Sequence, residues 1–556
     1  MNEYLKLKQS NCKNCYKCIR NCPVKSIRFS DNQANIIDDA CILCGGCFVV
    51  CPQNAKQIRC DVSSVQELIA SGAPVYASVA PSFIANYNNT SMLALKTALV
   101  KLGFTDAEET AIGAELVKKQ YDEMVDAGRR SIIISSCCPT INMLIQKYYP
   151  DALPYLAPVV SPMIAHCKDI KRRHPEAKTV FIGPCISKKS EADDSRSVVD
   201  AALTFEDLTD WLREESLSIG YEEEGTGCRS RLFPIAGGIL RSMSVANPDY
   251  TYLSVDGIEK CKQTIEELLS SKPAKCFVEM SACTGGCVGG PAMDESRRQP
   301  LHGALAVDRY AGKTDIGVIG VQDALRRSYA PLTLPRVHIS DEAIANVLKQ
   351  IGKTKPEHEL NCGSCGYNTC REKAVAVLQG KANLAMCLPY LKEKAESFSD
   401  NIIENSPNAI FVLNESFEMQ QVNAAACTLM NIREPRDVIG EPVVRLLDPQ
   451  PFVTALENQQ NIYDCRVFLA DYGKYVDQTV LYDGSFHILI CIMRDVTAEV
   501  RQLQSKESLS RTTIDIADKM IEKQMRTVQE IASLLGETTA ETRIALSRLK
   551  EALKDE

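Results

Sequence analysis

The sequence lacks the features that would place it on a nucleic acid or in a membrane. Its 63 Lys and Arg residues are outnumbered by 71 Asp and Glu residues, which leaves a net charge of −8. That balance disfavours a broad basic surface for nucleic acid or anionic lipid. No apolar run approaches the roughly 18 residues that a membrane helix needs. The first residues, "MNEYLKLKQSNCKNC", contain no apolar signal core. We therefore expect a soluble, cytoplasmic protein.

Histidine is also scarce, whereas cysteine is abundant. The 556 residues include only 6 histidines but 25 cysteines. In a reducing compartment, cysteines at short regular spacings bind metals far more often than they form disulfides. The odd count also disfavours complete disulfide pairing. Because mixed zinc sites need histidines, this ratio favours iron-sulfur clusters held by thiolates.

Residues 1–62 contain one cysteine pattern twice. "CKNCYKCIRNCP" and "CILCGGCFVVCP" both read C-x2-C-x2-C-x3-C-P. In two-cluster ferredoxins, the first three cysteines of such a run bind one 4Fe-4S cluster and the fourth binds the other. A pair of zinc knuckles is the alternative. We expect two clusters with these ligand sets: Cys12, Cys15, Cys18 and Cys51 for one, and Cys41, Cys44, Cys47 and Cys22 for the other.

The next region, residues 63–335, alternates short apolar runs with amphipathic stretches. "APVYASVAPS", "RSIIISSCCP", "KTVFIGPC" and "KCFVEMSAC" are typical of strands, and "DAEETAIGAELVKKQYDEMVDAG" is typical of a helix. This alternation predicts an α/β domain with a largely parallel sheet. Sites in such sheets form beyond the carboxyl ends of the strands. Cysteines stand at three of these ends, which we expect to converge on one cluster: Cys137, Cys138, Cys185, Cys283 and Cys287.

The loops around these cysteines resemble a known family. "SSCCP", "GPCISKKSE" and "EMSACTGGCVGG" resemble the three signature loops of iron-iron hydrogenases, and "VAPS" at residues 79–82 resembles a segment that contacts their cofactor. The resemblance covers about residues 1–330 and implies an H-cluster. That cofactor joins a 4Fe-4S cubane through one thiolate to a di-iron unit with CO, cyanide and an azadithiolate. The implied cubane ligands are Cys138, Cys185, Cys283 and Cys287, the last of which bridges to the di-iron unit.

The same resemblance implies roles for other residues near the cofactor. Cys137 faces away from Cys138, because successive side chains alternate along a strand, and it would carry protons to the di-iron amine. Lys188 would donate hydrogen bonds to a cyanide, with Glu191 holding it in place. Further cofactor contacts are expected from Ala80, Pro81, Ser82, Met163, Pro184 and Ser281. As alternatives, Cys137 is an inert buried thiol and Ser82 is a helix N-cap. Lys188 and Glu191 would then be ordinary surface residues.

The sequence also departs from the family pattern. Three positions differ from the usual Trp, Gln and Met of proton-reducing members: Ile141, Met163 and Ser281. Beyond the proton-carrying cysteine, the family uses a serine and two glutamates. Alignment of the motifs places Ala157 at the serine, Ile112 at one glutamate and Glu115 at the other. We therefore predict an interrupted proton relay and slow turnover, because a positioned acid or base contributes about 10²–10⁴ in rate.

Two further modules are expected after residue 335. In residues 336–395, "CGSCGYNTCREKAVAVLQGKANLAMC" resembles a small Fe-S domain of anaerobic redox proteins. It implies a third accessory 4Fe-4S cluster, with zinc as the alternative, on Cys362, Cys365, Cys370 and Cys387. Residues 396–498 resemble a PAS sensor domain through "ENSPNAIFVLNESFEMQQVNAAACTLM" and "RDVTAE". The PAS ligand is unknown, and His487 is expected to be a partly buried strand histidine more than a haem ligand.

Residues 499–556 predict a helical, coiled-coil-like C-terminus. Apolar residues follow a 3–4 spacing from Val500 onward, with polar interruptions. Gly536 predicts a helix stop, and Thr538 with Glu541 predicts a capping box for a last short helix. We expect this segment to dimerise, with packing on its own domain as the alternative.

These features together predict a multidomain protein of α/β and α+β parts that acts as a sensory-type iron-iron hydrogenase. It would interconvert H2 with protons and electrons slowly and pass its redox state through 4Fe-4S clusters to the PAS module. Expected partners are a redox carrier such as ferredoxin, a cytoplasmic signalling kinase or phosphatase, hydrogenase maturation proteins and a second copy of the chain. Three alternatives stay open: an ordinary fermentative or bifurcating hydrogenase, a non-catalytic iron-sulfur assembly or scaffold protein, and a redox sensor with a dead hydrogenase domain.

Overall fold

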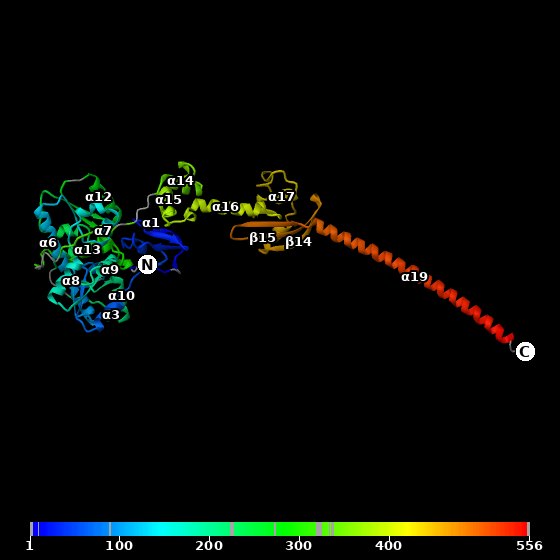
Figure 1. Ribbon diagram of the computed structural model, residues 1–556, viewed down its shortest axis with the longest axis horizontal. Helices are drawn as coiled ribbons and strands as arrows, with labels where there is room; N and C mark the ends of the chain where they lie inside the picture. Colours follow the sequence, from blue (N-terminus) through cyan, green and yellow to red (C-terminus); the bar gives the residue numbers. More distant parts are fainter. Residues whose placement is uncertain are drawn as a thin grey trace. The chain divides into compact units, whose positions relative to one another are not determined.

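The computed structural model describes residues 4–8, 11–87, 90–222, 227–271, 274–317, 325–332, 334 and 339–552. The chain divides into two compact units, Met1–Leu391 and Lys392–Glu556 (Figure 1). Within the described residues, every helix is too short or too polar to span a bilayer.

The N-terminal domain consists of two similar halves. Its elements are two antiparallel strand pairs and two one-turn helices: β1 (Leu5–Leu7) with β4 (Lys56–Ile58), β2 (Ile27–Ser30) with β3 (Gln33–Ile36), α1 (Lys17–Arg20) and α2 (Gly46–Val49). Gly45 precedes α2 with a φ of 73°. A Cβ at Gly45 would lie 2.4 Å from Cβ of Pro291. Glycine at this turn therefore lets the cysteine loop approach the α/β domain closely.

Two all-parallel sheets form the core of the α/β domain. Their strand orders are β6–β5–β8–β9 and β10–β11–β7. The strands are β5 (Val75–Val79), β6 (Asp106–Glu109), β7 (Ile132–Ile134), β8 (Lys178–Gly183), β9 (Ala201–Thr204), β10 (Thr251–Asp256) and β11 (Cys276–Ser281). The central strands are buried on both faces, as parallel strands between helices must be. The predicted α/β fold with parallel pairing is confirmed.

Helices connect the strands and cover the sheets. They are α3 (Val62–Ala70), α4 (Phe83–Asn86), α5 (Met92–Lys101), α6 (Ala111–Ala127), α7 (Pro139–Tyr148), α8 (Pro162–Arg173), α9 (Ser187–Asp193), α10 (Phe205–Glu214), α11 (Gly238–Ser242), α12 (Ile258–Ser271) and α13 (Pro300–Tyr310). One predicted boundary is wrong. Residues 106–109, expected at the start of a helix, form β6 instead, because their backbone pairs in parallel with β5. Four residues are too few for periodicity to separate strand from helix.

A small Fe-S region packs on the N-terminal domain. It contains α14 (Asp341–Gln350) and α15 (Cys370–Leu378). Lys25 Nζ donates to Gly366 O at 2.9 Å, and Phe29 N donates to Lys381 O at 2.9 Å. Both hydrogen bonds end on backbone carbonyls of the small region, and they hold the two regions side by side.

The second unit is a PAS fold followed by a long helix. After α16 (Leu388–Glu404) comes a five-stranded antiparallel sheet in the order β13–β12–β16–β15–β14. Its elements are β12 (Ala409–Asn414), β13 (Met419–Val422), α17 (Ala424–Leu429), α18 (Gln450–Asn458), β14 (Ile462–Leu469), β15 (Lys474–Asp483) and β16 (Ile488–Asp495). α16 ends at Glu404, and Ala409 and Ile410 then pair with β16.

The C-terminal helix differs from the prediction at its end. α19 (Thr497–Ala552) is one continuous helix that passes through Gly536 (Figure 1). The predicted stop and the capping box at Thr538 are therefore wrong. A helix-interior glycine costs only about 1 kcal/mol relative to alanine, and a helix propagates cooperatively once it has formed.

A buried charge cluster ties α9 to the rest of the α/β core. Lys189, whose side chain is 1% exposed, lies 2.9 Å from Asp61 Oδ2 and 2.8 Å from Asp207 Oδ2. Asp207 also forms a capping box with Thr204 at the start of α10. The cation therefore fixes α9, the segment before α3 and the start of α10 in one place.

We predict that Lys189→Met will lower the free energy of unfolding by about 3–5 kcal/mol, because it leaves the buried Asp207 carboxylate without its cation, whereas Asp61 keeps its ion pair with Arg59. Urea unfolding under anaerobic conditions measures this loss. As a control, Arg213→Ala removes an exposed ion pair with Asp210 and should cost less than about 1 kcal/mol. Equal effects of the two substitutions would contradict the assignment.

Candidate active site

The carboxyl ends of three strands meet at one cavity of about 110 Å³. Cys138 follows β7, Cys185 follows β8, and Cys283 and Cys287 follow β11. The lining also includes every other residue predicted to contact the cofactor: Ala80, Pro81, Ser82, Cys137, Met163, Pro184, Lys188 and Ser281. Four thiols and a cation in one apolar cavity are a donor set suited to an anionic iron-sulfur cofactor.

Glycines allow the cysteine loops to pack backbone against backbone. A Cβ at Gly286 would lie 2.5 Å from Pro234 O, and a Cβ at Gly290 would lie 2.7 Å from Pro184 O. The first contact places the loop after β11 against the segment before α11, and the second places it directly against the loop after β8. The Gly-rich sequence "CTGGCVGG" therefore brings Cys287 and Cys185 to the same cavity.

The two adjacent thiols pack against different parts of the core. Cys138 contacts the cluster that includes Ile141 and Leu144 of α7, whereas Cys137 contacts the cluster that includes Tyr121 of α6. Cys137 Sγ lies 3.2 Å from the Tyr121 hydroxyl. Burial raises the pKa of the Cys137 thiol to about 12. The thiol is therefore protonated near neutral pH and hydrogen-bonded in a cavity wall.

Lys188 lines the cavity and forms an ion pair with Glu191. Its Nζ donates to Glu191 Oε2 at 2.7 Å, and the two side chains are 11% and 4% exposed. Glu191 also accepts from Ser161 Oγ at 2.9 Å. Burial lowers the pKa of Lys188, but Glu191 outweighs it, and the net pKa is raised. The ammonium thus stays charged inside an apolar cavity.

Ser82 shows an unmatched donor at the cavity. Its side chain is fully buried, and Ser82 Oγ has no hydrogen-bond partner among the residues that the structure describes. It precedes α4 but makes no side-chain cap, so the N-cap alternative is not what the structure shows. A buried hydroxyl without a partner is costly. A cofactor acceptor such as cyanide would satisfy it, which is a specific fit between these residues and an H-cluster.

Glu115 lies behind the cavity wall and is held by other groups. It is fully buried, 3.2 Å from Lys118 Nζ, and it accepts from the Ser230 hydroxyl. Lys118 lies in turn 2.7 Å from Asp315. This ion-pair network accounts for Glu115, and among the described contacts none joins it to Cys137. Ala157, predicted to occupy the family's serine position, has no side-chain group that could bridge them.

The accessory cysteines gather in the predicted sets. One pocket is lined by Cys12, Cys15, Cys18 and Cys51, a second by Cys22, Cys41, Cys44 and Cys47, and a third by Cys362, Cys365, Cys370 and Cys387. Within the described part of the chain, no three Cys, His, Asp or Glu residues lie close enough for one metal ion. Cys44 also lines the active-site cavity.

One PAS prediction is corrected. His487 is not a partly buried strand histidine but lies in the exposed turn before β16, with its side chain 71% exposed and Nδ1 2.9 Å from Glu415. The short, polar "YDGSF" sequence before it favours a hairpin turn. An exposed turn histidine is poorly placed to hold haem in the PAS core.

Comparison with known proteins defines first the class and then the family. Residues 4–65 match a 4Fe-4S dicluster domain, residues 359–389 match an Fe-S cluster family, and residues 397–468 match the PAS fold. The chain is thus an iron-sulfur protein with a PAS domain. Residues 73–291 match the iron only hydrogenase large subunit, C-terminal domain. The predicted resemblance is confirmed.

Two curated relatives are similar to the same region. The periplasmic Fe hydrogenase large subunit of Nitratidesulfovibrio vulgaris is 24% identical over 254 residues, which cover 35% of this chain and 60% of the relative. Iron hydrogenase 1 of Clostridium pasteurianum is 23% identical over 284 residues, which cover 40% and 49%. The chain thus spans about half to three fifths of their length. A solved FeFe-hydrogenase variant from Chlamydomonas reinhardtii matches with 18% identity and a TM-score of 0.39, over 49% of this chain and 99% of that chain.

The ion pair at Lys188 predicts a pH effect. Because Glu191 raises the pKa of Lys188 against burial, the charged lysine is present below its folded pKa and is lost as pH rises through it. Glu191→Gln removes the raising charge and leaves burial, which lowers the pKa. We expect dye-linked H2 oxidation by Glu191→Gln to fail at a lower pH than in the unmodified protein. Exposed Glu214→Gln is the control, and an alkaline limit unmoved by Glu191→Gln would refute the role.

Proposed function

We propose that the chain is a slow, sensory-type iron-iron hydrogenase that interconverts H2 with protons and electrons. The observation that carries the proposal is the convergence of four thiols, the Lys188 ammonium and the unmatched Ser82 hydroxyl on one apolar cavity. A scaffold that lacks the di-iron unit would have no use for a buried cation and a buried free donor aimed at anionic ligands. This favours the hydrogenase over a non-catalytic assembly protein.

The chain's own residues divide the work around the cofactor. Cys138, Cys185, Cys283 and Cys287 would hold a 4Fe-4S cubane, and Cys287 would also bridge to the di-iron unit. That group, when bound, supplies the open iron site and basic amine at which H2 is split or formed. Lys188 and Ser82 would orient it by hydrogen bonds. Cys137 would exchange a proton with the cavity, and the apolar lining would exclude bulk water.

Electrons would pass along the accessory clusters. The pocket of Cys22, Cys41, Cys44 and Cys47 shares Cys44 with the active-site cavity. The third Fe-S region packs on the same domain through Tyr367 and Ile19. A redox carrier such as ferredoxin would exchange electrons at this end, and maturation proteins would install the di-iron unit. The cytoplasmic location stays a prediction.

The direct test is hydrogen isotope exchange. After anaerobic cluster reconstitution and maturation with a synthetic di-iron complex, the protein should form HD from D2 and H2O. Mass spectrometry follows this reaction without any redox partner. A rate well below that of a matured fermentative hydrogenase supports the sensory reading, and an equal rate supports the fermentative alternative. No exchange at all would refute the enzyme.

The two adjacent thiols give a separable prediction. Cys137→Ala should lower H2 turnover by about 10²–10⁴, the contribution of a positioned general acid or base, while the iron content stays the same. Cys138→Ala is the matched variant, and it should lose cubane iron instead. Loss of iron in Cys137→Ala would mean that the two roles are reversed.

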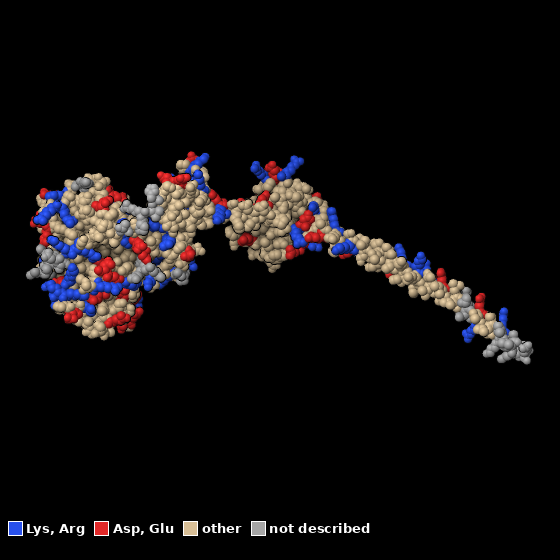
Figure 2. Space-filling model, in the orientation of Figure 1, with Lys and Arg blue, Asp and Glu red and all other residues tan. Residues whose placement is uncertain are grey.

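The PAS domain and α19 would carry the signal to a kinase or phosphatase through a dimer of this chain. Along α19, apolar residues at heptad spacing include Ile514, Ile521 and Val528, which are 57%, 59% and 61% exposed. Figure 2 shows long uncharged stretches on this helix. β-branched residues at such positions favour a two-stranded coiled coil. The exposed stripe argues against a helix packed on its own domain.

We predict that Ile521→Glu will convert a dimer to a monomer, because it places a charge in the centre of the apolar stripe. Light scattering measures the mass. Lys519→Glu, two positions away on the outward side of the heptad, should leave the dimer intact. A monomeric parent chain, or a dimer in Ile521→Glu, would contradict the proposal.

A further inference from the structure

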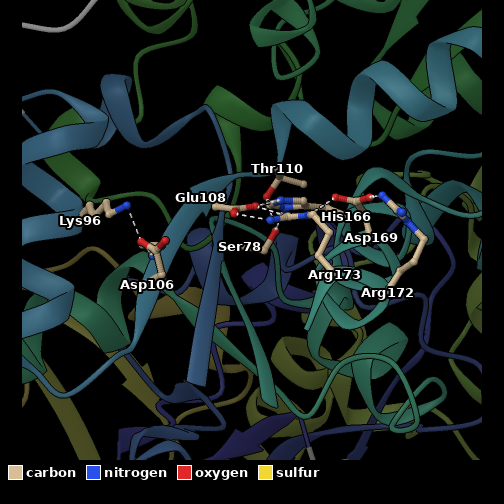
Figure 3. Close-up of polar contacts among 10 residues, drawn as sticks. Ser78, Lys96, Asp106, Glu108, Thr110, His166, Asp169, Arg172 and Arg173 are labelled. Carbon is tan, nitrogen blue, oxygen red and sulfur yellow. Dashed lines mark hydrogen bonds and ion pairs between the residues drawn. The ribbon is translucent and has the colours of Figure 1, made fainter. Parts of the chain in front are cut away.

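A threonine hydroxyl in the wall of the active-site cavity begins a chain of hydrogen-bonded side chains that is separate from Cys137. Thr110 lines the cavity and stands just before α6. Its Oγ1 lies 2.8 Å from Ser78 Oγ, and Ser78 Oγ lies 2.8 Å from His166 Nδ1 (Figure 3). Ser78 and His166 are fully buried. Two hydroxyls and an imidazole therefore run in unbroken contact away from the cavity.

The chain reaches solvent on its far side. His166 Nε2 lies 3.1 Å from Glu108 Oε2, and the Glu108 side chain is 19% exposed. Arg173, 32% exposed, holds Glu108 by two hydrogen bonds and is itself fixed by Asp169 (Figure 3). Burial raises the pKa of Glu108, but hydrogen bonds from His166 and Arg173 outweigh it and lower the pKa to about 2. The carboxylate therefore remains ionised.

An ionised Glu108 fixes the direction of the hydrogen bonds. It accepts from Nε2–H of His166, which leaves the Nδ1 lone pair to accept the Ser78 hydroxyl proton. Ser78 then accepts from Thr110, whose oxygen is open toward the cavity. Close packing of α6 on α8 fixes the backbone and Cβ of His166, because a Cβ at Gly113 of α6 would lie 2.7 Å from His166 Cβ.

We propose that Thr110, Ser78, His166 and Glu108 form a proton route between the cavity and solvent, in place of the relay that ends at Cys137. This inference rests on the proposed function. In the outward direction, a proton from the cavity binds Thr110 Oγ1 as the Thr110 proton passes to Ser78 and the Ser78 proton passes to His166 Nδ1. The imidazolium then loses its Nε2 proton to solvent water at the edge of Glu108. Rotation of the ring and the hydroxyls restores the starting state.

Two observations distinguish this route from ordinary core hydrogen bonding. A buried histidine needs only local partners, yet this chain is continuous from a cavity-lining residue to a partly exposed carboxylate. The family's own relay is interrupted here at Ala157 and Ile112, and its remaining Glu115 is held by Lys118. A second route would explain how the site can still exchange protons. Because the Glu108 carboxylate at the solvent end is a weak base, proton release through it agrees with slow turnover.

The test compares two cuts in the route with one matched change outside it. Thr110→Val and Ser78→Ala each remove one hydroxyl at nearly constant volume. Thr179→Val removes an equally buried threonine hydroxyl of β8, which donates to Val198 O and lies outside the route. Each matured protein is assayed for H2 oxidation in H2O and D2O, and the CO and cyanide infrared bands report the cofactor.

We expect both cuts to lower kcat by about 10²-fold or more, with unchanged KM for H2, unchanged infrared bands and a larger solvent isotope effect. Thr179→Val should match the parent. His166→Gln, which keeps hydrogen bonds but cannot carry the proton, should behave like the two cuts. If Thr110→Val and Ser78→Ala keep the kcat of the parent protein and show intact infrared bands, the proton route is wrong but the proposed function stands. Loss of the bands only in the variants would also overturn the route, and absence of the bands in the parent would overturn the proposed function.

Discussion

The structure depends on bringing groups that resist burial into one apolar cavity. Four cysteines and the Lys188 ammonium meet where parallel strands end, and each would be unfavourable there without a compensating charge. The Glu191 carboxylate supplies part of that compensation, and the proposed iron-sulfur cluster would supply the rest. Other features hold the cavity walls in position. Glycines let the loops pack closely, Lys189 fixes α9, which carries Lys188, and the capping box fixes the start of α10.

Much of this arrangement could be predicted from the sequence, because cysteine spacing constrains geometry strongly. The crossed sets of the N-terminal domain follow from a repeated pattern, and the structure gathers each set around its own pocket. Strand runs ending in Gly or Pro placed Cys138 and Cys185 at the correct sheet edge. The sequence pattern predicted less well at residues 106–109, where four residues are too few to separate a strand from a helix. It also failed at Gly536, where the exposed helix continues through a glycine that was expected to end it.

Other parts could not be predicted, because they depend on which buried polar groups meet. Ser78 and His166 lie in largely apolar stretches, "YASVAPS" and "SPMIAHCKD", and their pairing needs the contact between β5 and α8. A buried polar residue in an otherwise apolar run is the only signal that marked them. Tyr121, the partner of Cys137, is likewise an ordinary position on an amphipathic helix until the fold places it beside the thiol.

In the proposed function, this cavity holds a di-iron cofactor with CO and cyanide, and the PAS domain responds to the redox state of that cofactor. Infrared spectroscopy of the matured protein under argon and then under H2 tests it most directly. The account predicts terminal CO and cyanide bands that shift when H2 is admitted and return when it is removed. A matured protein with a full complement of 4Fe-4S clusters and no such bands would contradict it.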